Sequence, residues 1–258
     1  MRSGSSARRI VYGYHPVAAL LDAGRCRVYQ VMLVHGGTSP SLGALRSMIS
    51  AAGVRVNEVD RNTLDQVAGT RSHQGVVAQC TDYPYAGLED VVSVSGRGPV
   101  LLLDQVQDPQ NLGAILRSAL FFGARGVILP RSRSAQVTPA VTKASAGASE
   151  YLVVARTGGI DQAVRSLKSK GFWIIGAEAD GEMKPEAAPW DQDCALILGG
   201  EDSGLRRVLR NRCDAVVGIR GVQKGVGCLN VATAAGVLLF AAHSGSSGDL
   251  EKMSDFKK

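Results

Sequence analysis

Three segments of the chain place polar residues and glycines directly after apolar runs, where a ligand could bind. The first follows the run Val100–Leu103 and contains Asn111, Gly113 and Arg117. We expect Asn111 to cap the helix that follows, with Arg117 nearly two turns further along and close to the face of Gly113. A glycine in a first turn lets another backbone or a ligand approach closely. The alternative is that these residues only form a capped helix with an exposed arginine and bind no ligand.

The second segment joins the apolar run Ala195–Leu198 to a turn that contains Gly199, Gly200, Glu201 and Asp202. A strand, a glycine-rich turn and a helix can hold a nucleotide, or a phosphate at the helix N-terminus. However, the segment lacks the Lys-Ser/Thr pair of a Walker A loop and the G-x-G-x-x-G spacing, and its carboxylates would repel phosphate. A neutral or cationic ligand therefore fits better. An ordinary turn with acidic residues at a helix start remains the alternative.

The third segment is a glycine-rich loop that begins at Ile219 and leads into a helix expected over Leu229–Ala242. This helix consists almost entirely of small and apolar residues, so we expect it to be buried, either in the core or at a subunit interface. Asn230 would then be a buried polar group that requires a hydrogen-bond partner.

Apolar runs and helical patterns alternate throughout the second part of the chain. Continuous apolar runs are typical of parallel strands that are buried on both faces. The expected strands are Val100–Leu103, Gly126–Leu129, Leu152–Val154, Phe172–Gly176, Ala195–Leu198 and Ala215–Ile219. The expected helices are Leu112–Phe122, Ile160–Lys170, Leu205–Arg212 and Leu229–Ala242. Together they predict an open α/β sheet with crossover helices, in which ligands bind at the carboxyl ends of the strands.

The first part of the chain predicts a smaller α/β unit. Its expected elements are helices over Val17–Leu21 and Leu42–Ala52 and strands over Val28–Val34, Val54–Val59 and Val76–Gln79. A stretch rich in proline, glycine and serine follows and interrupts the periodicity. We therefore predict a first domain over residues 10–82, a linker over 83–99, a second domain over 100–243 and a flexible tail over 244–258.

Composition narrows the class of protein. The 258 residues are 45% hydrophobic and 20% charged, which excludes a disordered or fibrous chain. The net charge of +6 favours a polyanionic partner such as RNA. Five dispersed cysteines without a Cys-x-x-Cys pair predict neither a disulfide framework nor a zinc site, and favour the cytoplasm. We also expect no export signal, no membrane span and no metal, and structural roles for His15 and His73.

In this order and at these separations, the three segments resemble the motifs of the SpoU/TrmH branch of the SPOUT methyltransferases. The residues that carry the resemblance are Asn111 to Arg117, the Gly199-Gly200-Glu201 turn and Leu229-Asn230-Val231. The stretches Tyr12–Leu20 and His73–Ala78 resemble the substrate-binding domain of the bacterial 23S rRNA guanosine-2'-O-methyltransferases. The resemblance extends from Val11 to about Ala242.

The resemblance implies an enzyme that uses S-adenosylmethionine to methylate a ribose 2'-hydroxyl in RNA. It implies an L30e-like α/β domain that binds the substrate, followed by a SPOUT catalytic domain with a parallel sheet and a deep trefoil knot. The cofactor would contact Gly199, Ile219 and Leu229. Members act as homodimers with the active site near the subunit interface. Within this family, the resemblance is strongest to enzymes that methylate a guanosine in 23S rRNA, so this is the expected activity.

By the same resemblance, Arg117, Asn111, Glu201 and Asn230 are the catalytic residues. A guanidinium is essentially always protonated, so we expect Arg117 to grip a phosphate and stabilise the developing alkoxide rather than act as the base. Glu201 would orient Arg117 or the substrate. Asn111 and Asn230 would position the ribose and the adjoining loops by hydrogen bonds.

The chain departs from the family pattern at two places. Cys228 stands where the family usually has serine, and Ile219-Arg220-Gly221 replaces the usual Ile-Pro-Met. A thiol is a weak hydrogen-bond donor, and the missing proline leaves the loop less rigid. Three alternatives therefore stay open: a tRNA ribose 2'-O-methyltransferase, a non-catalytic RNA-binding or ribosome-assembly protein, and a nucleotide-binding metabolic enzyme. Candidates for phosphate contacts, or for a merely solvated face, are Arg8, Arg9, Arg71, Arg131 and Arg133.

Overall fold

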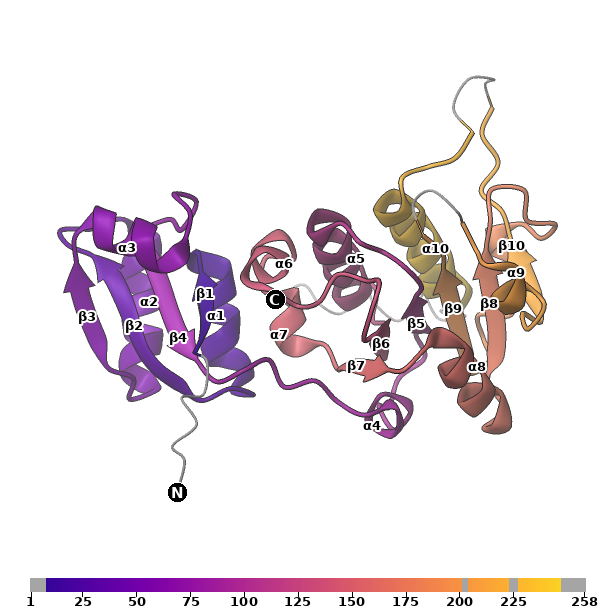
Figure 1. Cartoon of the computed structure of the whole chain (residues 1–258), viewed down its shortest axis with the longest axis horizontal. Coiled ribbons are helices and arrows are strands. Elements are labelled where there is room, and N and C mark those ends of the chain that lie inside the picture. Colours follow the sequence, from indigo (N-terminus) through magenta and orange to yellow (C-terminus); the bar gives the residue numbers. More distant parts are fainter. Residues whose placement is uncertain (1–7, 201–203, 223–226, 247–258) are drawn as a thin grey trace, which may run out of the picture. The chain divides into compact units, whose positions relative to one another are not determined.

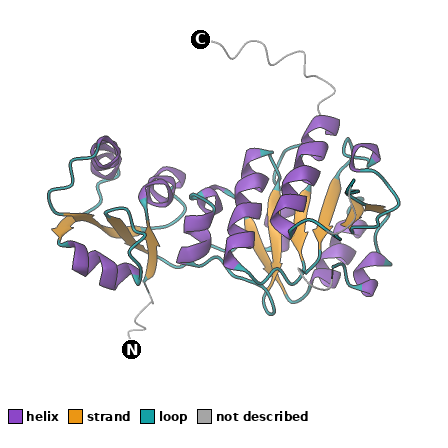
Figure 2. Ribbon diagram, turned by 90° about the horizontal axis from the view of Figure 1, so that it is seen from above, coloured by secondary structure: helices purple, strands orange, loops and turns teal. Residues whose placement is uncertain are grey.

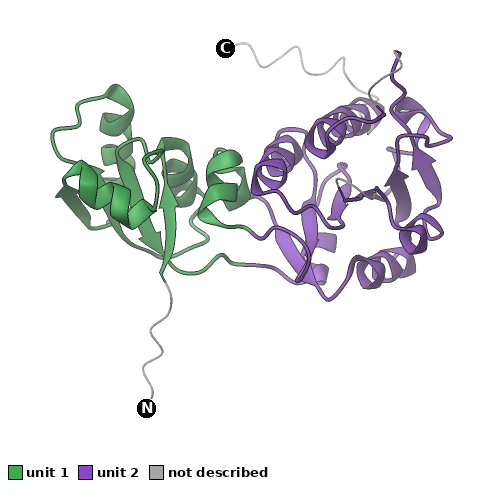
Figure 3. Ribbon diagram, turned by 45° about the horizontal axis from the view of Figure 1, so that its top comes forward, with its two compact units in different colours: residues 1–84, 137–151 green, residues 85–136, 152–258 purple. Residues whose placement is uncertain are grey.

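The computed structural model describes residues 8–200, 204–222 and 227–246, which divide into two compact units (Figure 3). Unit 1 contains the chain up to Pro84 together with Val137–Tyr151, and unit 2 contains Tyr85–Gln136 and the chain from Leu152 onward. Both units combine helices with a sheet, which confirms the predicted α/β class. Val137–Tyr151 packs in unit 1 although it lies within the range 100–243 predicted for the second domain.

Unit 1 is built on a four-stranded sheet in the order β1-β4-β2-β3 (Figure 1). Strand β4 is antiparallel to both of its neighbours, and β2 is parallel to β3. The strands are β1 (Arg9–Tyr12), β2 (Val28–Val34), β3 (Val56–Val59) and β4 (Val76–Cys80). The helices are α1 (Tyr14–Ala23), α2 (Pro40–Ala51), α3 (Arg61–Ala68), α6 (Pro139–Ala144) and α7 (Ala148–Tyr151).

Local signals explain which elements of unit 1 the sequence predicted. Strand β2 has the predicted bounds, and α1 and α2 contain or closely match their predicted ranges. Helix α3 was not predicted, although Asp60 caps it by accepting a hydrogen bond from Thr63 N at 2.9 Å and Gly69 ends it with a φ of 64°. Strand β1 and helices α6 and α7 were also missed, because four to six residues carry too little periodicity.

A buried ion pair joins β1 to the segment that carries α6 and α7. Arg9 is 9% exposed, and its Nη1 donates a hydrogen bond to Glu150 Oε2 at 3.2 Å while Nη2 donates to Glu150 Oε1. Nη2 also donates to Thr142 Oγ1 at 3.1 Å. The interpretation of Arg9 as a phosphate contact is therefore wrong, since its guanidinium is buried and already neutralised by a carboxylate.

Unit 2 is built on a six-stranded sheet in which all neighbours are parallel, in the order β10-β8-β9-β5-β6-β7. This confirms the predicted parallel sheet. The strands are β5 (Val100–Leu103), β6 (Gly126–Pro130), β7 (Val154–Thr157), β8 (Trp173–Ala177), β9 (Cys194–Leu198) and β10 (Ala215–Val217). The helices are α4 (Leu88–Val92), α5 (Pro109–Phe121), α8 (Ile160–Ser169), α9 (Arg207–Arg210) and α10 (Val231–Ser246), with a 3₁₀ turn η1 (Pro185–Ala187).

Some predicted bounds in unit 2 are wrong. The strand expected at Leu152–Val154 begins only at Val154, and the helix expected over Leu205–Arg212 is confined to Arg207–Arg210. Helix α4 lies within the range 83–99 that was expected to be a linker, and its Val91 is fully buried. This short helix was not predicted because the proline and glycine residues on either side of it are typical of a loop.

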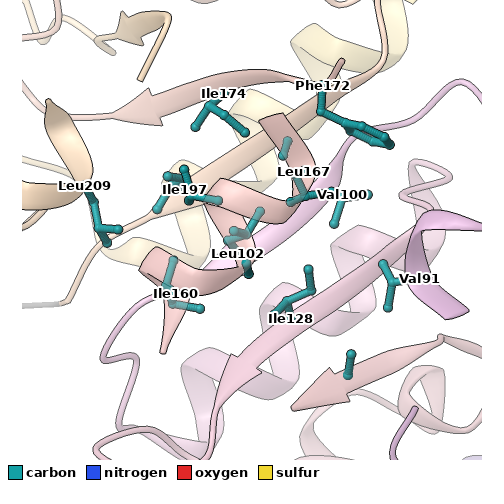
Figure 4. Packing of buried hydrophobic residues seen from close by; sticks show 14 of the residues in the cluster. Val91, Val100, Leu102, Ile128, Ile160, Leu167, Phe172, Ile174, Ile197 and Leu209 are labelled. Carbon is teal, nitrogen blue, oxygen red and sulfur yellow. The ribbon is translucent and has the colours of Figure 1, made fainter. Parts of the chain in front are cut away.

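The core of unit 2 forms because alternate strand residues point to opposite faces of the sheet. On one face, side chains of β5, β6, β8 and β9 pack against α4, α8 and α9 (Figure 4). Helices α5 and α10 pack against each other. Figure 2 shows helices against the strands of this sheet. No helix in the described part of the chain is long and apolar enough to cross a membrane.

The strand order reverses beside β5. The chain runs outward from β5 to β6 and β7, then crosses to β8 and returns with β9 next to β5. In open α/β sheets, ligands bind outside the carboxyl ends of strands at such a reversal. The trefoil knot implied by the resemblance stays a prediction.

Candidate functional site

A cavity of about 360 Å³ lies at the carboxyl ends of three strands of unit 2. The segments that follow β8, β9 and β10 contribute to its wall, together with the start of α10. Its lining residues are Ala177, Glu178, Ala179, Leu198, Gly199, Gly200, Gly204, Val217, Ile219, Cys228, Leu229, Asn230, Val231, Ala234 and Leu238. The cavity therefore brings together the second and third segments singled out in the sequence, including Gly199, Ile219 and Leu229.

The described lining of the cavity contains one charged side chain, and that side chain is ion-paired. Among the lining residues given above, Glu178 is the only charged side chain. Glu178 Oε2 accepts a hydrogen bond from Arg210 Nε at 2.6 Å, and this bond raises the pKa of Arg210 above its usual value. The sequence interpretation missed Glu178. Its position directly after the apolar run of β8 was the available signal, because ligands bind at carboxyl ends of strands.

The turn after β9 can close only because it contains glycines. Gly200 N donates a hydrogen bond to Gly204 O at 3.1 Å, and Gly204 N donates to Gly200 O at 3.0 Å. A Cβ atom on Gly199 would lie 2.1 Å from the Gly204 carbonyl oxygen, far inside van der Waals contact. Gly204 itself has a φ of 60°, which glycine adopts without strain. Glu201, predicted to be catalytic, lies outside the described residues.

A second connection holds the segment after this turn to the end of β5. Asp104 follows β5, is 3% exposed and accepts hydrogen bonds from Arg206, with Arg206 Nη2 to Asp104 Oδ1 at 3.0 Å. The pKa of Arg206 is raised, chiefly by this hydrogen-bonded carboxylate. The pair fixes the start of α9 to the central strand, which positions one wall of the cavity. The sequence interpretation assigned no role to either residue.

An amide pair connects the first segment to the third. Asn230 Nδ2 donates a hydrogen bond to Asn111 Oδ1 at 3.0 Å. Asn230 Oδ1 accepts from the backbone N–H of Ala232 at 2.9 Å and so caps α10. Two expectations are corrected here. Asp108, not Asn111, caps α5, and Asn230 is exposed rather than buried, although it has the expected partner.

Arg117 lies on α5, outside the lining of the cavity. Its side chain is exposed and has no hydrogen-bond or ion-pair partner among the residues that the structure describes. Six residues of helix separate it from Asn111, or about 9 Å along the axis. The guanidinium is therefore available to a ligand that approaches α5 from solvent.

Neither His15 nor His73 lines the cavity. His73 is fully buried, with Nε2 2.7 Å from Asp65 Oδ1 and Nδ1 accepting a hydrogen bond from Gly75 N at 3.0 Å. This is the structural role expected from the sequence. His15 is exposed. Within the described ranges there is no group of three or more histidine, cysteine, aspartate or glutamate side chains that could hold a metal ion.

Two families match most of the chain. The SpoU rRNA Methylase family matches residues 98–240, and the RNA 2'-O ribose methyltransferase substrate binding family matches residues 10–86. The 23S rRNA (guanosine-2'-O-)-methyltransferase RlmB of Xanthomonas campestris pv. campestris is 35% identical over 242 residues, which cover 92% of this chain and 97% of that protein.

Solved structures confirm the fold. The SpoU methyltransferase AviRb of Streptomyces viridochromogenes superposes with a TM-score of 0.78 at 23% identity, covering 93% of this chain and 90% of that one. An AdoMet-bound rRNA methyltransferase of Sinorhizobium meliloti gives a TM-score of 0.77 at 23% identity, with 92% and 87% of the two chains covered. The similarity therefore spans both units.

Proposed function

Since the chain belongs to the SpoU rRNA methylase family, we propose that it transfers the methyl group of S-adenosylmethionine to the 2'-oxygen of a guanosine ribose in 23S rRNA. The match to the methylase family supports methyl transfer, and the match to the substrate-binding family supports an RNA substrate. The observation that carries the proposal is the cavity at the ends of β8, β9 and β10. It collects the glycine turn and the start of α10, which come from distant parts of the sequence.

The cavity suits S-adenosylmethionine in size, lining and charge. Its volume lies within the range of small-molecule sites, roughly 300–1,000 Å³. Most of its wall is apolar, which fits an adenosine, and Glu178, the one carboxylate among its described lining residues, is compatible with a sulfonium cation. Gly199, Ile219 and Leu229 would hold the cofactor. When bound, the cofactor supplies an electrophilic methyl carbon for in-line attack by the ribose oxygen.

Methyl transfer would release S-adenosylhomocysteine and one proton, so the protein must hold the ribose in line and let the 2'-hydroxyl proton pass to water. A guanidinium is a permanent cation in proteins, so the proposed role of Arg117 is to hold the phosphate and stabilise negative charge developing on the 2'-oxygen. Asn111 and Asn230 hold the starts of α5 and α10 together and offer amide groups to the ribose. For Glu201 the proposed role is to orient Arg117 or the substrate.

We also propose that the enzyme is a cytoplasmic homodimer. Large apolar side chains are exposed on both α5 and α10. Phe121, on α5, is 81% exposed, and Phe240, on α10, is 59% exposed. An exposed apolar patch of this kind is typical of an association surface. The double variant Phe121→Asp, Phe240→Asp should then be a monomer, as measured by size-exclusion chromatography with light scattering. An unchanged mass would contradict this surface as the interface.

The function is tested by incubating the full-length protein with unmodified large-subunit rRNA and methyl-labelled S-adenosylmethionine, then mapping the label. A methylated guanosine 2'-oxygen in 23S rRNA supports the proposal. Label that enters tRNA but not rRNA overturns the substrate assignment and leaves the enzyme class intact. Cofactor binding without transfer to either RNA indicates a non-catalytic protein, a result that Cys228 in the cavity wall would help to explain.

The role of Arg117 has its own test. Arg117→Ala should abolish methyl transfer and leave the dissociation constant of S-adenosylmethionine nearly unchanged, because the side chain lies outside the cavity. Arg165→Ala, an exposed arginine on α8, is the matched control and should retain full turnover. Full turnover in Arg117→Ala would remove the mechanistic assignment.

A further inference from the structure

The sheet of unit 1 has two unlike faces. Helices α1 and α2 pack with one face in an apolar cluster that includes Val11 and Leu33. On the other face, α3 packs only over a smaller apolar cluster around Met32, Leu64 and Val77. Alternation along the strands places further residues of β2, β3 and β4 on this second face, beyond the α3 cluster.

Those further residues are amides, and they form a continuous hydrogen-bonded row across the strands. Gln30 Nε2 donates to Gln79 Oε1 at 2.8 Å, and Asn57 Nδ2 donates to Gln30 Oε1 at 2.7 Å. An arginine closes each end: Arg8 Nη1 donates to Gln79 Oε1 at 3.4 Å, and Arg55 Nε donates to Asn57 Oδ1 at 3.2 Å. We call Gln79, Gln30 and Asn57 the amide ladder.

The side chains of the amide ladder are held in place by one another, but the fold does not use all of their hydrogen-bonding groups. All three amides are only partly buried, so water still reaches this face. Every bond in the row runs toward Gln79, whose oxygen accepts twice while its Nε2 has no partner among the described residues. The ladder therefore presents fixed amide groups, with donor capacity left over, to whatever approaches the sheet.

Positive charge and an aromatic ring lie beside the ladder. Tyr29 lies between two guanidinium groups, with the Arg8 carbon 5.3 Å and the Arg27 carbon 5.7 Å from its ring centroid. Arg8, Arg27 and Arg55 are exposed, and none has a carboxylate within 4.0 Å in the described part of the chain. By contrast, Arg46 on the α2 side of the unit is paired with Glu58 at 2.7 Å. The cations beside the ladder remain available to an external anion.

We infer that this face of unit 1 binds a single-stranded or loop segment of the RNA substrate. Basic side chains that follow the backbone, an aromatic ring for stacking and polar groups for base edges are the three features that recognise unpaired RNA. A protein partner would favour an apolar centre with few charges, which this face lacks. In this assignment the three arginines contact phosphates, Tyr29 stacks on a base and the amide ladder contacts base edges. The inference rests on the proposed function, because it takes RNA to be the substrate.

The first test removes the charge in the full-length protein. The triple variant Arg8→Gln, Arg27→Gln, Arg55→Gln is compared with Arg61→Gln, Arg165→Gln, Lys170→Gln, which loses the same charge from α3, α8 and the residue after α8. Binding of an unmodified 23S rRNA fragment is measured by fluorescence anisotropy at several salt concentrations. For single-stranded RNA, each lost phosphate contact makes the plot of log affinity against log salt less steep by about 0.7, so we expect a reduction of about 2 for the first variant only.

The second test leaves the charge in place. Tyr29→Leu should weaken RNA binding roughly 5- to 150-fold, the range expected when one base loses its aromatic stacking partner. Gln79→Met keeps the size and the net charge but removes the amide donor and acceptor, so it should also weaken binding. In both variants the affinity for S-adenosylmethionine should stay at the wild-type value, since the cavity belongs to unit 2.

The outcomes separate this inference from the proposed function. If the wild type binds the RNA and the two charge variants lose equal affinity, or neither loses any, the ladder face is not the binding surface while the proposed function stands. Unchanged binding by both Tyr29→Leu and Gln79→Met also overturns it. If the wild type takes up S-adenosylmethionine but shows no salt-dependent RNA binding, the proposed function fails and the inference fails with it.

Discussion

Replacing Asn230 by alanine should destabilise unit 2 and weaken cofactor binding, because one side chain performs two tasks. Its Oδ1 caps α10 through Ala232 N at 2.9 Å, and loss of such a cap costs about 1 kcal/mol, with a range of roughly 0.5–2. Its Nδ2 donates to Asn111 Oδ1, and a bond of this kind contributes about 1 kcal/mol. Since Asn230 is exposed, we expect a total loss of about 1–2 kcal/mol in the free energy of unfolding.

Replacing Asn230 by aspartate, which has the same shape but carries a charge, separates the capping of α10 from the hydrogen bond to Asn111. In Asn230→Asp one oxygen can still accept from the helix N-terminus, where a carboxylate gains roughly 0.3–1 kcal/mol from the helix dipole. The second oxygen then faces the oxygen of Asn111, so the connection between α5 and α10 is lost. We expect Asn230→Asp to unfold at nearly the wild-type urea concentration, yet to bind S-adenosylmethionine more weakly and transfer methyl groups more slowly.

The assays are urea denaturation, calorimetric titration of S-adenosylmethionine and single-turnover methyl transfer. A double-mutant cycle of Asn111→Ala and Asn230→Ala should give a coupling energy of about 0.5–1.5 kcal/mol, because the residues are in direct contact. Additive effects in the cycle would refute the contact. Equal destabilisation by aspartate and alanine at position 230 would refute the assignment of the cap.

Two further predictions concern the glycine turn and the buried ion pair. Gly199→Ala should weaken cofactor binding and destabilise the fold by about 1–3 kcal/mol, because its Cβ would meet the Gly204 carbonyl. Gly43→Ala, in open space within α2, should instead stabilise the protein by roughly 0.5–1 kcal/mol in the same denaturation assay. Glu150→Gln should cost about 3–5 kcal/mol by leaving the guanidinium of Arg9 buried without a counter-charge, whereas replacing both partners by methionine should cost less. Equal losses in the single and double replacements would contradict that explanation.

The sequence predicted the sheet of unit 2 because its strands other than β7 are continuous apolar runs, whereas β7 contains Arg156 and Thr157 and its bounds were predicted wrongly. The resemblance to the SpoU/TrmH motifs pointed to Gly199, Ile219 and Leu229, which line one cavity. Asn111 was misplaced because the Asp108-Pro109 pair just before it is a stronger helix start, with Asp108 accepting from Gln110 N at 2.9 Å.

Other features depend on long-range contacts that no local pattern encodes. Glu178 lines the cavity only because β8 lies between β9 and β10, an order that residue types do not reveal. Arg9 looked like a surface cation, and its partner Glu150 is 141 positions away in the sequence. The amide ladder was invisible for the same reason, since its members come from three separate strands.

The placement of Val137–Tyr151 limits how this protein can be divided. The polypeptide changes unit after Pro84, after Gln136 and again after Tyr151. A fragment that starts at Tyr85 would therefore retain α6 and α7 but lack β1, and the carboxylate of Glu150 would have no Arg9. Because the chain passes between the units three times, no cut at a single peptide bond separates them into two intact pieces.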